Sequence, residues 1–391
     1  MQTRDTPLLE GLTVIDFASV GPAARASRIL ADYGAKIIKI GPIAAKSGKQ
    51  IIPPFHTYGA GRGMQKIRVD LKSPAGRDVV CKLAGYADVI IESYRPGVAD
   101  RLGIGYADMK AYNRRIVYCS TSGYGQDGPY SSWAGHDINY LAVGGFLDCS
   151  GRDENGVPAI PGATVADGAG GGMHAALAIM AALFRRNNSS EGTYLDVSIT
   201  DGVVNLMSLY LDQYLAGGEE TRPRSGVLTG KYACYGIYAT ADEKFVSVGA
   251  IEPHFFQNLC TKLDLAEYCE HQYVEHKQDM IRAAFQRCFL TKTRDQWTEI
   301  LSNEDTCVAP VLAISEVVRD RHLRARDTFM GACHPEYGSF EQVGPVLAGS
   351  LRKQPVHRVQ AYDVSDCDTI LSASGFTTEE ISRLHETEVV E

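Results

Sequence analysis

Short apolar runs alternate with amphipathic segments along the first part of the chain. Residues 12–17 and 35–40 are rich in apolar and β-branched side chains, which is typical of buried strands, and residues 23–33 between them have helical periodicity. Gly34 follows that helix and predicts where it ends. A strand, a helix and a second strand in this order predict parallel strands joined by a right-handed crossover.

The same alternation is repeated further along the chain. Residues 74–84 follow Ser73, a favourable helix N-cap, and begin with proline, so a helix is predicted there. Residues 88–92 and 116–121 have the composition of buried strands. The pattern predicts an α/β fold with a doubly wound parallel sheet, whose ligands bind at the carboxyl ends of the strands.

The pattern changes near residue 226. Residues 231–250 alternate like a hairpin, and helical segments follow, one of them opened by Thr293 and Gln296 placed as a capping box. We therefore predict three parts, namely a large α/β domain, a helical linker and a smaller α/β domain. Their expected bounds are residues 1–200, completed by about 315–391, for the large domain, 201–226 for the linker and 227–314 for the small domain.

Composition and charge remove several classes of function. The formal charge of −8 excludes a broad nucleic-acid-binding surface, and the ten cysteines are scattered without a CxxC pair, so neither a zinc site nor a disulfide framework is predicted. The turn after the first strand lacks the GxGxxG pattern of nicotinamide and flavin sites. We expect a cytoplasmic protein without a membrane span, because no signal segment or peroxisomal tripeptide is present.

Candidate chemistry is concentrated in two segments. His136 lies in the run AGHDINY, and Asp167 precedes the glycine-rich residues 168–172, which open an apolar helical segment. An imidazole and a carboxylate can flank one carbon atom, and the glycines allow a close backbone approach to an anion at a helix start. Taken singly, His136 is also compatible with a structural histidine, and Asp167 with a helix N-cap.

Several motifs in order carry a resemblance to a known family. The chain resembles family III CoA-transferases and, within that superfamily, is most similar to α-methylacyl-CoA racemases. The likeness covers roughly residues 7–350. Its main carriers are the segments PLLEGL (7–12), LADYGA (30–35), VDLK (69–72), ADV (87–89), RPGV (95–98) and SGYG (122–125).

The resemblance assigns roles to three residues. His136 matches the catalytic acid/base of racemases. Asp167 matches an aspartate that is a proton carrier in racemases but a nucleophile in transferases. Glu252, in the segment AIEP, resembles a glutamate that pairs with the histidine, although a glutamate before Pro253 is also typical of a helix start.

Further residues are candidates for binding the CoA moiety or lining the cleft. Arg95 follows a strand end and is a candidate phosphate contact, as a solvated loop arginine would also be. Asp137 is an alternative partner for His136. The full set of binding candidates is Lys39, Arg62, Lys66, Arg95, Tyr124, Gly135, Asp137 and Tyr140.

The chain departs from the family pattern near the expected phosphate contacts. Residues 62–66 replace a more basic run, and residues 40–42 lack the usual charged residue. The carrier of the acyl group is therefore either free CoA or a phosphopantetheine thioester. The resemblance implies no metal and no tightly bound cofactor, with CoA as part of the substrate. It also implies an interlocked homodimer, in which Glu252 comes from the other chain.

Inversion of a carbon beside a thioester requires proton removal on one face and proton return on the other, through an enolate. His136 and Asp167 predict this chemistry. We therefore expect an isomerase, an acyl-CoA racemase or epimerase acting on 2-methyl-branched acyl-CoA thioesters by 1,1-proton transfer. Two alternatives stay open. One is a CoA-transferase between carboxylic acids with Asp167 as nucleophile, and the other is a thioester-binding protein without turnover.

Overall fold

The computed structural model describes residues 7–18, 20–44, 54–57, 62–345, 357–359, 361 and 364–391. The chain forms two compact units. The first consists of Met1–Gly145, Pro161–Ser208 and Arg321–Glu391, and the second of Phe146–Ile160 and Leu209–Asp320. Residues 146–160 thus belong to the second unit, whereas the sequence pattern places them within the large domain.

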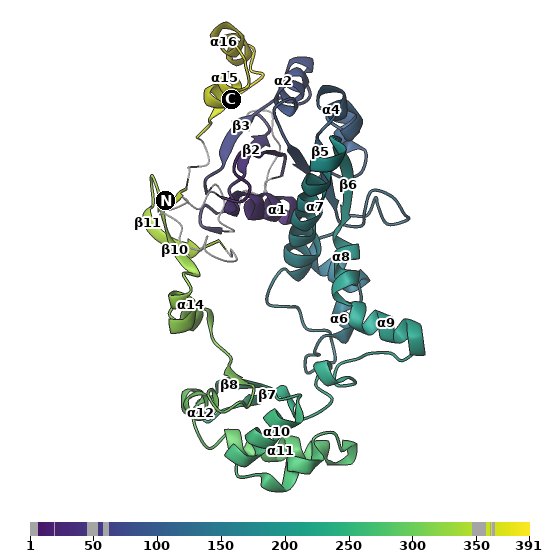
Figure 1. Cartoon of the computed structure of the whole chain (residues 1–391), viewed down its shortest axis with the longest axis vertical. Coiled ribbons are helices and arrows are strands. Elements are labelled where there is room, and N and C mark those ends of the chain that lie inside the picture. The colour runs from purple at the N-terminus through teal and green to yellow at the C-terminus, as the bar shows by residue number, and fades with distance from the viewer. Residues whose placement is uncertain are drawn as a thin grey trace. The chain divides into compact units, whose positions relative to one another are not determined.

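A six-stranded parallel sheet is the centre of the first unit (Figure 1). The strand order reverses between β1 and β4, so the chain leaves the middle of the sheet in both directions, as in doubly wound folds. This confirms the predicted fold class. In spatial order the strands are β3 (Gln65–Arg68), β2 (Lys36–Gly41), β1 (Thr13–Asp16), β4 (Val89–Glu92), β5 (Val117–Ser122) and β6 (Thr193–Ser198).

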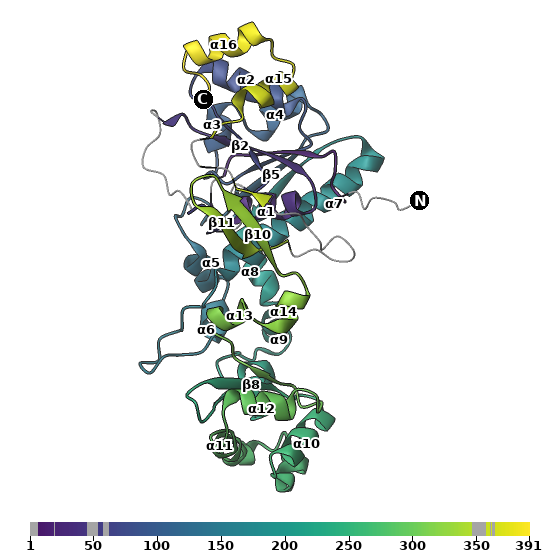
Figure 2. The same ribbon diagram turned by 90° about the vertical axis from the view of Figure 1, so that its left-hand side faces the viewer.

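Helices cover both faces of this sheet (Figures 1 and 2). On one face, Val14, Ile37 and Val117 pack with side chains of α1 (Gly21–Asp32) and α7 (His174–Ser189). On the other face, alternate strand residues pack with four helices. These are α2 (Pro74–Ala84), α4 (Tyr106–Tyr112), α15 (Cys367–Ala373) and α16 (Thr378–Glu386). Burial on both faces explains why the strands are continuous apolar runs.

The remaining elements of the first unit lie around this sandwich. A second sheet has the order β11-β10-β12. Its strands are β10 (Phe329–His334), β11 (Gly338–Val343) and β12 (His357–Arg358), and the other helices are α3 (Val98–Leu102), α5 (Asp137–Val143), a π-helix (Ala166–Met173), α8 (Ile199–Leu206) and α14 (Arg321–Ala325).

The second unit has its own sheet and core. Its aromatic core contains Tyr238, Phe256 and Phe285, and the predicted capping box is confirmed, since Thr293 and Gln296 each accept the other's backbone N–H. Its strands are β7 (Tyr235–Ala239), β8 (Phe245–Gly249) and β9 (Val308–Pro310). Its helices are α6 (Phe146–Cys149), α9 (Ser208–Gly217, whose first residue belongs to the first unit), α10 (Pro253–Lys262), α11 (Gln278–Phe289), α12 (Arg294–Leu301), α13 (Ile314–Val317) and three short 3-10 helices (Val227–Thr229, Ala266–His271 and Glu275–Lys277).

Among the helices in the described ranges, none combines the length and the apolar character that a bilayer span requires.

Candidate active site

The carboxyl ends of β4 and β5 lead into the segments that carry most of the candidate residues. Glu92 ends β4 and Arg95 follows it, while β5 ends at Ser122 and is followed by the loop that leads to His136. Because parallel strands end at the same edge of a sheet, these loops share one edge of the first unit, next to the reversal of strand order.

His136 is the N-cap of α5. Its backbone N–H donates to Asn139 Oδ1 at 2.9 Å, and its carbonyl accepts the N–H of Asn139 at 2.8 Å. These two bonds fix the entry of the chain into the helix. The imidazole itself is on an exposed residue, so solvent or a ligand can reach it.

Tyr140 holds the segment that carries His136. Its hydroxyl donates to the carbonyl of Gly135 at 2.6 Å, and burial, with the charge of Asp167 next, raises the pKa of Tyr140 to about 12. A Cβ atom on Gly123 would lie 2.4 Å from the tyrosine ring, and one on Gly135 would lie 2.7 Å from it. Gly135 and Tyr140, predicted as binding or cleft residues, therefore pack against each other in the segment that carries His136.

Asp167 lies on the π-helix that runs directly into α7. π-Helices are rare in proteins, and those that do occur often lie at functional sites. Its backbone N–H donates to Asp137 Oδ1 at 2.8 Å. Burial raises the pKa of the half-buried Asp167 carboxyl, the charge of Asp137 raises it further, and Arg25 and His136 oppose the rise. His136 and Asp167 are thus electrostatically coupled within one unit.

The glycine run after Asp167 was expected to allow a close backbone approach to an anion, and in the structure it packs closely against neighbouring helices. A Cβ on Gly171 would lie 2.5 Å from Pro22 Cβ of α1, and a Cβ on Gly202 of α8 would lie 1.9 Å from the carbonyl oxygen of Gly170. The run therefore lets the π-helix pack between two helices. The N–H of Gly168 is also occupied, because it donates to the Thr164 carbonyl at 2.9 Å.

The four basic residues among the binding candidates lie in different environments. Lys39 forms an ion pair of 2.7 Å with the buried Asp16. Arg62 is 3% exposed and donates to the carbonyl of Val343 at 2.8 Å, so its contacts hold the β10–β11 hairpin. Lys66 is partly buried, with its Nζ 3.5 Å from the carbonyl of Ala361. Arg95 is the exposed residue of the four.

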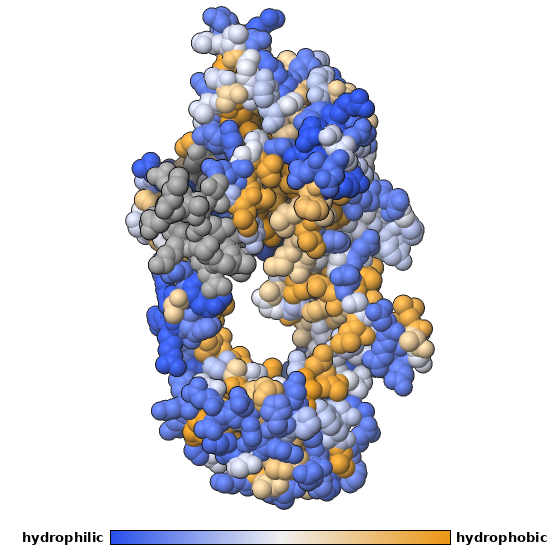
Figure 3. Space-filling view, in the orientation of Figure 1, coloured by the Kyte–Doolittle hydropathy of each residue, from blue (hydrophilic) through white to orange (hydrophobic). Residues whose placement is uncertain are grey.

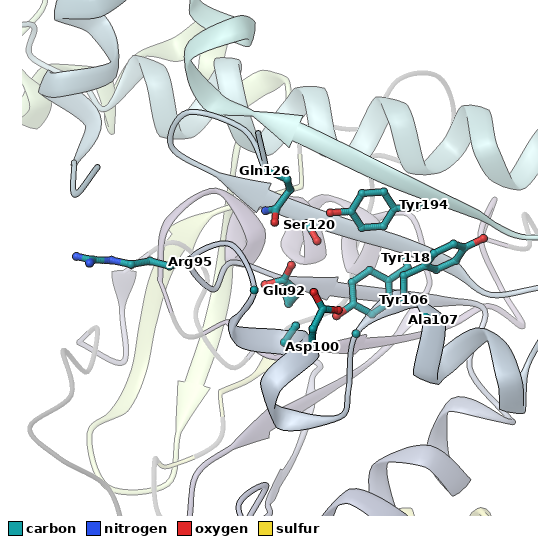
Figure 4. Close-up of a pocket in the computed structure, with 12 residues that line it drawn as sticks. Glu92, Arg95, Asp100, Tyr106, Ala107, Tyr118, Ser120, Gln126 and Tyr194 are labelled. Atoms are coloured by element: carbon teal, nitrogen blue, oxygen red, sulfur yellow. The ribbon is translucent and has the colours of Figure 1, made fainter. Parts of the chain in front are cut away.

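A cavity of about 270 Å³ lies beside this edge (Figure 4). Glu92 contributes a carboxyl group that is 2% exposed and accepts the backbone N–H of Tyr94 at 2.6 Å, and burial raises the pKa of Glu92. Figure 4 shows Arg95 directed away from Glu92 and the tyrosines of the cavity. The lining residues are Glu92, Arg95, Gly97, Ala99, Asp100, Gly105, Tyr106, Ala107, Tyr118, Ser120, Gln126 and Tyr194.

Two further candidates are placed as follows. Tyr124 contacts the ring of Tyr140 edge-on, with ring centroids 5.2 Å apart. Glu252 lies in the second unit, where it is the exposed N-cap of α10 and Pro253 is the first helical residue. The helix-start alternative is therefore confirmed for Glu252, and its pairing with His136 stays a prediction.

Sequence reasoning missed Glu92 and the structural use of Asp137. A charged residue at the end of the apolar strand 88–92 was the available signal for Glu92, because a buried carboxylate needs specific partners. Asp137 had been considered as a partner of His136. Its carboxylate instead accepts the backbone N–H of Asp167, a contact between residues 30 positions apart that no local pattern predicts.

Comparison with known proteins decides the family. The model of CoA-transferase family III matches residues 9–360 of the chain. The chain belongs to this family. Human α-methylacyl-CoA racemase is 32% identical over 98% of this chain and 97% of its own length. Human succinyl-CoA:glutarate CoA-transferase is 30% identical over 88% of this chain and 81% of its own length.

Solved structures support the fold of this family III chain. A CaiB/BaiF family protein from Brucella suis has a TM-score of 0.76 at 23% identity, covering 94% of this chain and 98% of that one. The Mycobacterium tuberculosis protein Rv3272 has a TM-score of 0.77 at 23% identity, covering 91% and 97%. Racemases and transferases both occur among the relatives, so family membership alone is compatible with either reaction.

Proposed function

We propose that this family III protein is an acyl-CoA racemase or epimerase that inverts the α-carbon of a 2-methyl-branched acyl-CoA thioester by 1,1-proton transfer. The observation that carries the proposal is the bond of 2.8 Å from the Asp167 backbone N–H to Asp137 Oδ1, which brings the half-buried Asp167 to the start of the helix capped by the exposed His136. Two acid/base groups are what a two-sided proton transfer needs. The similarity to human α-methylacyl-CoA racemase supports the same reaction.

The environment of Asp167 suits proton transfer at neutral pH. An ordinary aspartate is a weak base, and burial raises the pKa of Asp167 toward the working pH, where general base catalysis is more effective. A two-sided transfer requires that one member of the pair carries a proton while the other is free. In one direction Asp167 removes the α-proton and His136 returns one, and in the other direction the roles are exchanged.

The enolate oxygen between these two steps needs hydrogen-bond donors. The glycine run had been expected to supply them from the start of its helix. The N–H of Asp167 donates instead to Asp137 Oδ1, and the N–H of Gly168 donates to the Thr164 carbonyl. In this proposal the glycine run contributes by placing Asp167, and the N–H groups of Asp167 and Gly168 do not serve the thioester oxygen.

CoA, or a phosphopantetheine thioester, enters this proposal as part of the substrate, and no tightly bound cofactor is required. Arg95 is the proposed phosphate contact, because it is exposed and follows β4 at the carboxyl edge of the sheet. Arg62 is a weaker candidate than the sequence suggested, since its guanidinium is buried and donates to Val343.

A panel of variants tests the assignment of His136 and Asp167. His136→Ala and Asp167→Asn should each lower the rate of α-proton exchange of a 2-methylacyl-CoA in deuterated water by about 10²- to 10⁴-fold. His276→Ala and Asp127→Asn are matched controls at exposed positions and should retain wild-type rates. Deuterium incorporation is measured by mass spectrometry. Unimpaired exchange in either site variant would remove that residue from the mechanism.

A CoA-transferase is the second candidate. Among the residues that the structure describes, the Asp167 carboxylate accepts no hydrogen bond, so its oxygens are available for nucleophilic attack on a thioester. The similarity to human succinyl-CoA:glutarate CoA-transferase also supports it. In that reaction the Asp167 carboxylate attacks the acyl carbonyl and releases the CoA thiolate, which forms a mixed anhydride. The thiolate then attacks the aspartyl carbonyl, which releases the first carboxylic acid as its carboxylate and leaves an aspartyl-CoA thioester. Borohydride reduction of such a thioester would mark the peptide containing residues 166–173.

A further inference from the structure

We propose that Asp137 is a positioning residue that anchors the backbone of Asp167 to the start of the helix carrying His136. This inference rests on the proposed function, because it concerns how the two proton carriers are held relative to each other. Asp137 is the first residue of α5 and follows His136 directly. Its Oδ1 accepts the N–H of Asp167 at 2.8 Å, across 30 residues of sequence.

The start of the π-helix is held from two sides. From α5, Asp137 binds the N–H of Asp167. From α1, Arg25 Nη2 donates to Thr164 Oγ1 at 2.5 Å, and the Thr164 carbonyl accepts the N–H of Gly168 at 2.9 Å. The α5 contact is the one that links the segments of the two proton carriers, because the bond connects the residue after His136 to the backbone N–H of Asp167.

Two-sided proton transfer depends on this connection. The reacting groups must stay on opposite sides of one carbon, and a displacement of about 1 Å can lower a rate roughly 100-fold. The backbone of His136 is held at the start of α5 by its hydrogen bond to Asn139. Asp137, the next residue, connects this helix start to Asp167 by accepting its backbone N–H. The role of Asp137 is therefore to keep the separation of the pair constant.

The carboxylate of Asp137 has a second effect through its charge. It raises the pKa of Asp167, after burial, while Arg25 of α1 and His136 lower it. Tyr140 of α5 also interacts with the Asp167 carboxyl, because the charge of Asp167 raises the pKa of Tyr140 after burial. Arg95 opposes that rise. Asparagine at position 137 would keep the hydrogen-bond acceptor and remove the charge, whereas alanine would remove both.

The two substitutions separate anchoring from charge. Asp137→Ala should lower kcat for α-proton exchange about 10- to 100-fold with little change in KM, because substrate contacts stay while the pair is displaced. It should also increase deuterium uptake at the amide of Asp167, measured by mass spectrometry of peptides covering residues 164–173. Asp137→Asn should retain amide protection close to wild type and move the acid limb of the kcat–pH profile to lower pH. The matched control Asp127→Asn removes the same charge at an exposed position and should change neither readout.

The amide measurement keeps this inference separate from the proposed function. A wild-type protein that exchanges no α-proton would overturn the racemase assignment, and amide uptake would still decide whether Asp137 anchors Asp167. Unchanged amide uptake in Asp137→Ala would overturn the anchoring role. If Asp137→Ala does not fold, Asp137→Leu decides by the same amide measurement, because leucine has a similar shape and offers no hydrogen-bond acceptor. Unchanged amide uptake in that variant would overturn the anchoring role.

Discussion

At the scale of single residues, Asp167 combines a functional position with an unfavourable environment. Its carboxyl is half-buried, and burial together with the negative charge of Asp137 disfavours the ionised form. A group of this kind lowers the stability of the folded state at neutral pH, because the unfolded chain solvates the carboxylate better. Such trade-offs between stability and activity are common at active sites.

This environment predicts that Asp167→Asn is more stable than the wild type at neutral pH, by about 0.5–2 kcal/mol. The sign follows from the raised pKa of the folded state. The ionised carboxylate destabilises the fold above that pKa, and the penalty disappears as the pH falls toward the ordinary value of 3.8. Urea unfolding at pH 8 and pH 5 measures the difference between variant and wild type. A difference that grows as the pH falls would contradict the account.

The catalytic candidates could be predicted from residue types and motifs. The burial and the contacts of the candidate residues depend on residues far away in the sequence. The run around His136 and the aspartate before the glycines stand out in the sequence. Arg62 looks like a phosphate contact by type, but it is 3% exposed because the β10–β11 hairpin, almost 270 residues later, covers it. Contacts between residues so far apart leave no local pattern in the sequence, so the burial of Arg62 could not be predicted from it.

At the scale of elements, the π-helix is the piece that places Asp167. Gly170 and Gly171 allow close contact with α8 and α1, respectively. The sequence predicted that the glycines permit a close approach, and the structure shows that α8 and α1 approach Gly170 and Gly171. The approach of an anion to this segment stays a prediction. A glycine pattern shows where backbone comes close, and its partner depends on the fold.

This packing predicts a large effect of Gly202→Ala. The new Cβ would lie 1.9 Å from the carbonyl oxygen of Gly170, so α8 and the π-helix must separate. We expect a loss of roughly 2–3 kcal/mol in the free energy of unfolding, measured by urea titration, with reduced α-proton exchange. Gly162→Ala is the control, because nothing lies within 4 Å of its Cβ position, and it should change stability by less than about 0.5 kcal/mol.

At the scale of the whole molecule, the repeated strand–helix pattern predicted a parallel sheet. The structure contains this sheet, with the strand order β3-β2-β1-β4-β5-β6. Buried parallel strands are short apolar runs, so they are easy to recognise. The sheet of β10, β11 and β12 was not predicted, because its strands are more exposed and have weaker apolar character.

Exposed apolar side chains lie on α7 and α8, and we propose that a second copy of the chain covers them in the expected homodimer. Leu177 is 63% exposed, Phe184 74% and Leu206 49%, and Figure 3 shows hydrophobic surface over this part of the first unit. We expect sedimentation equilibrium to give twice the mass of one 42.5 kDa chain. Leu177→Asp should weaken association at least about tenfold, with Leu290→Asp, 50% exposed in the second unit, as the control. A monomer across the working concentration range would contradict the homodimer.

The most direct test of the central claim is the isotopic content of the inverted product. One pure enantiomer of a 2-methylacyl-CoA is incubated with the protein in deuterated water, and the two enantiomers are separated and weighed by mass spectrometry. A two-sided proton transfer by His136 and Asp167 predicts that the newly formed enantiomer carries one deuterium at the α-carbon. No inversion and no deuterium, with transfer of CoA to an added carboxylic acid, would contradict it.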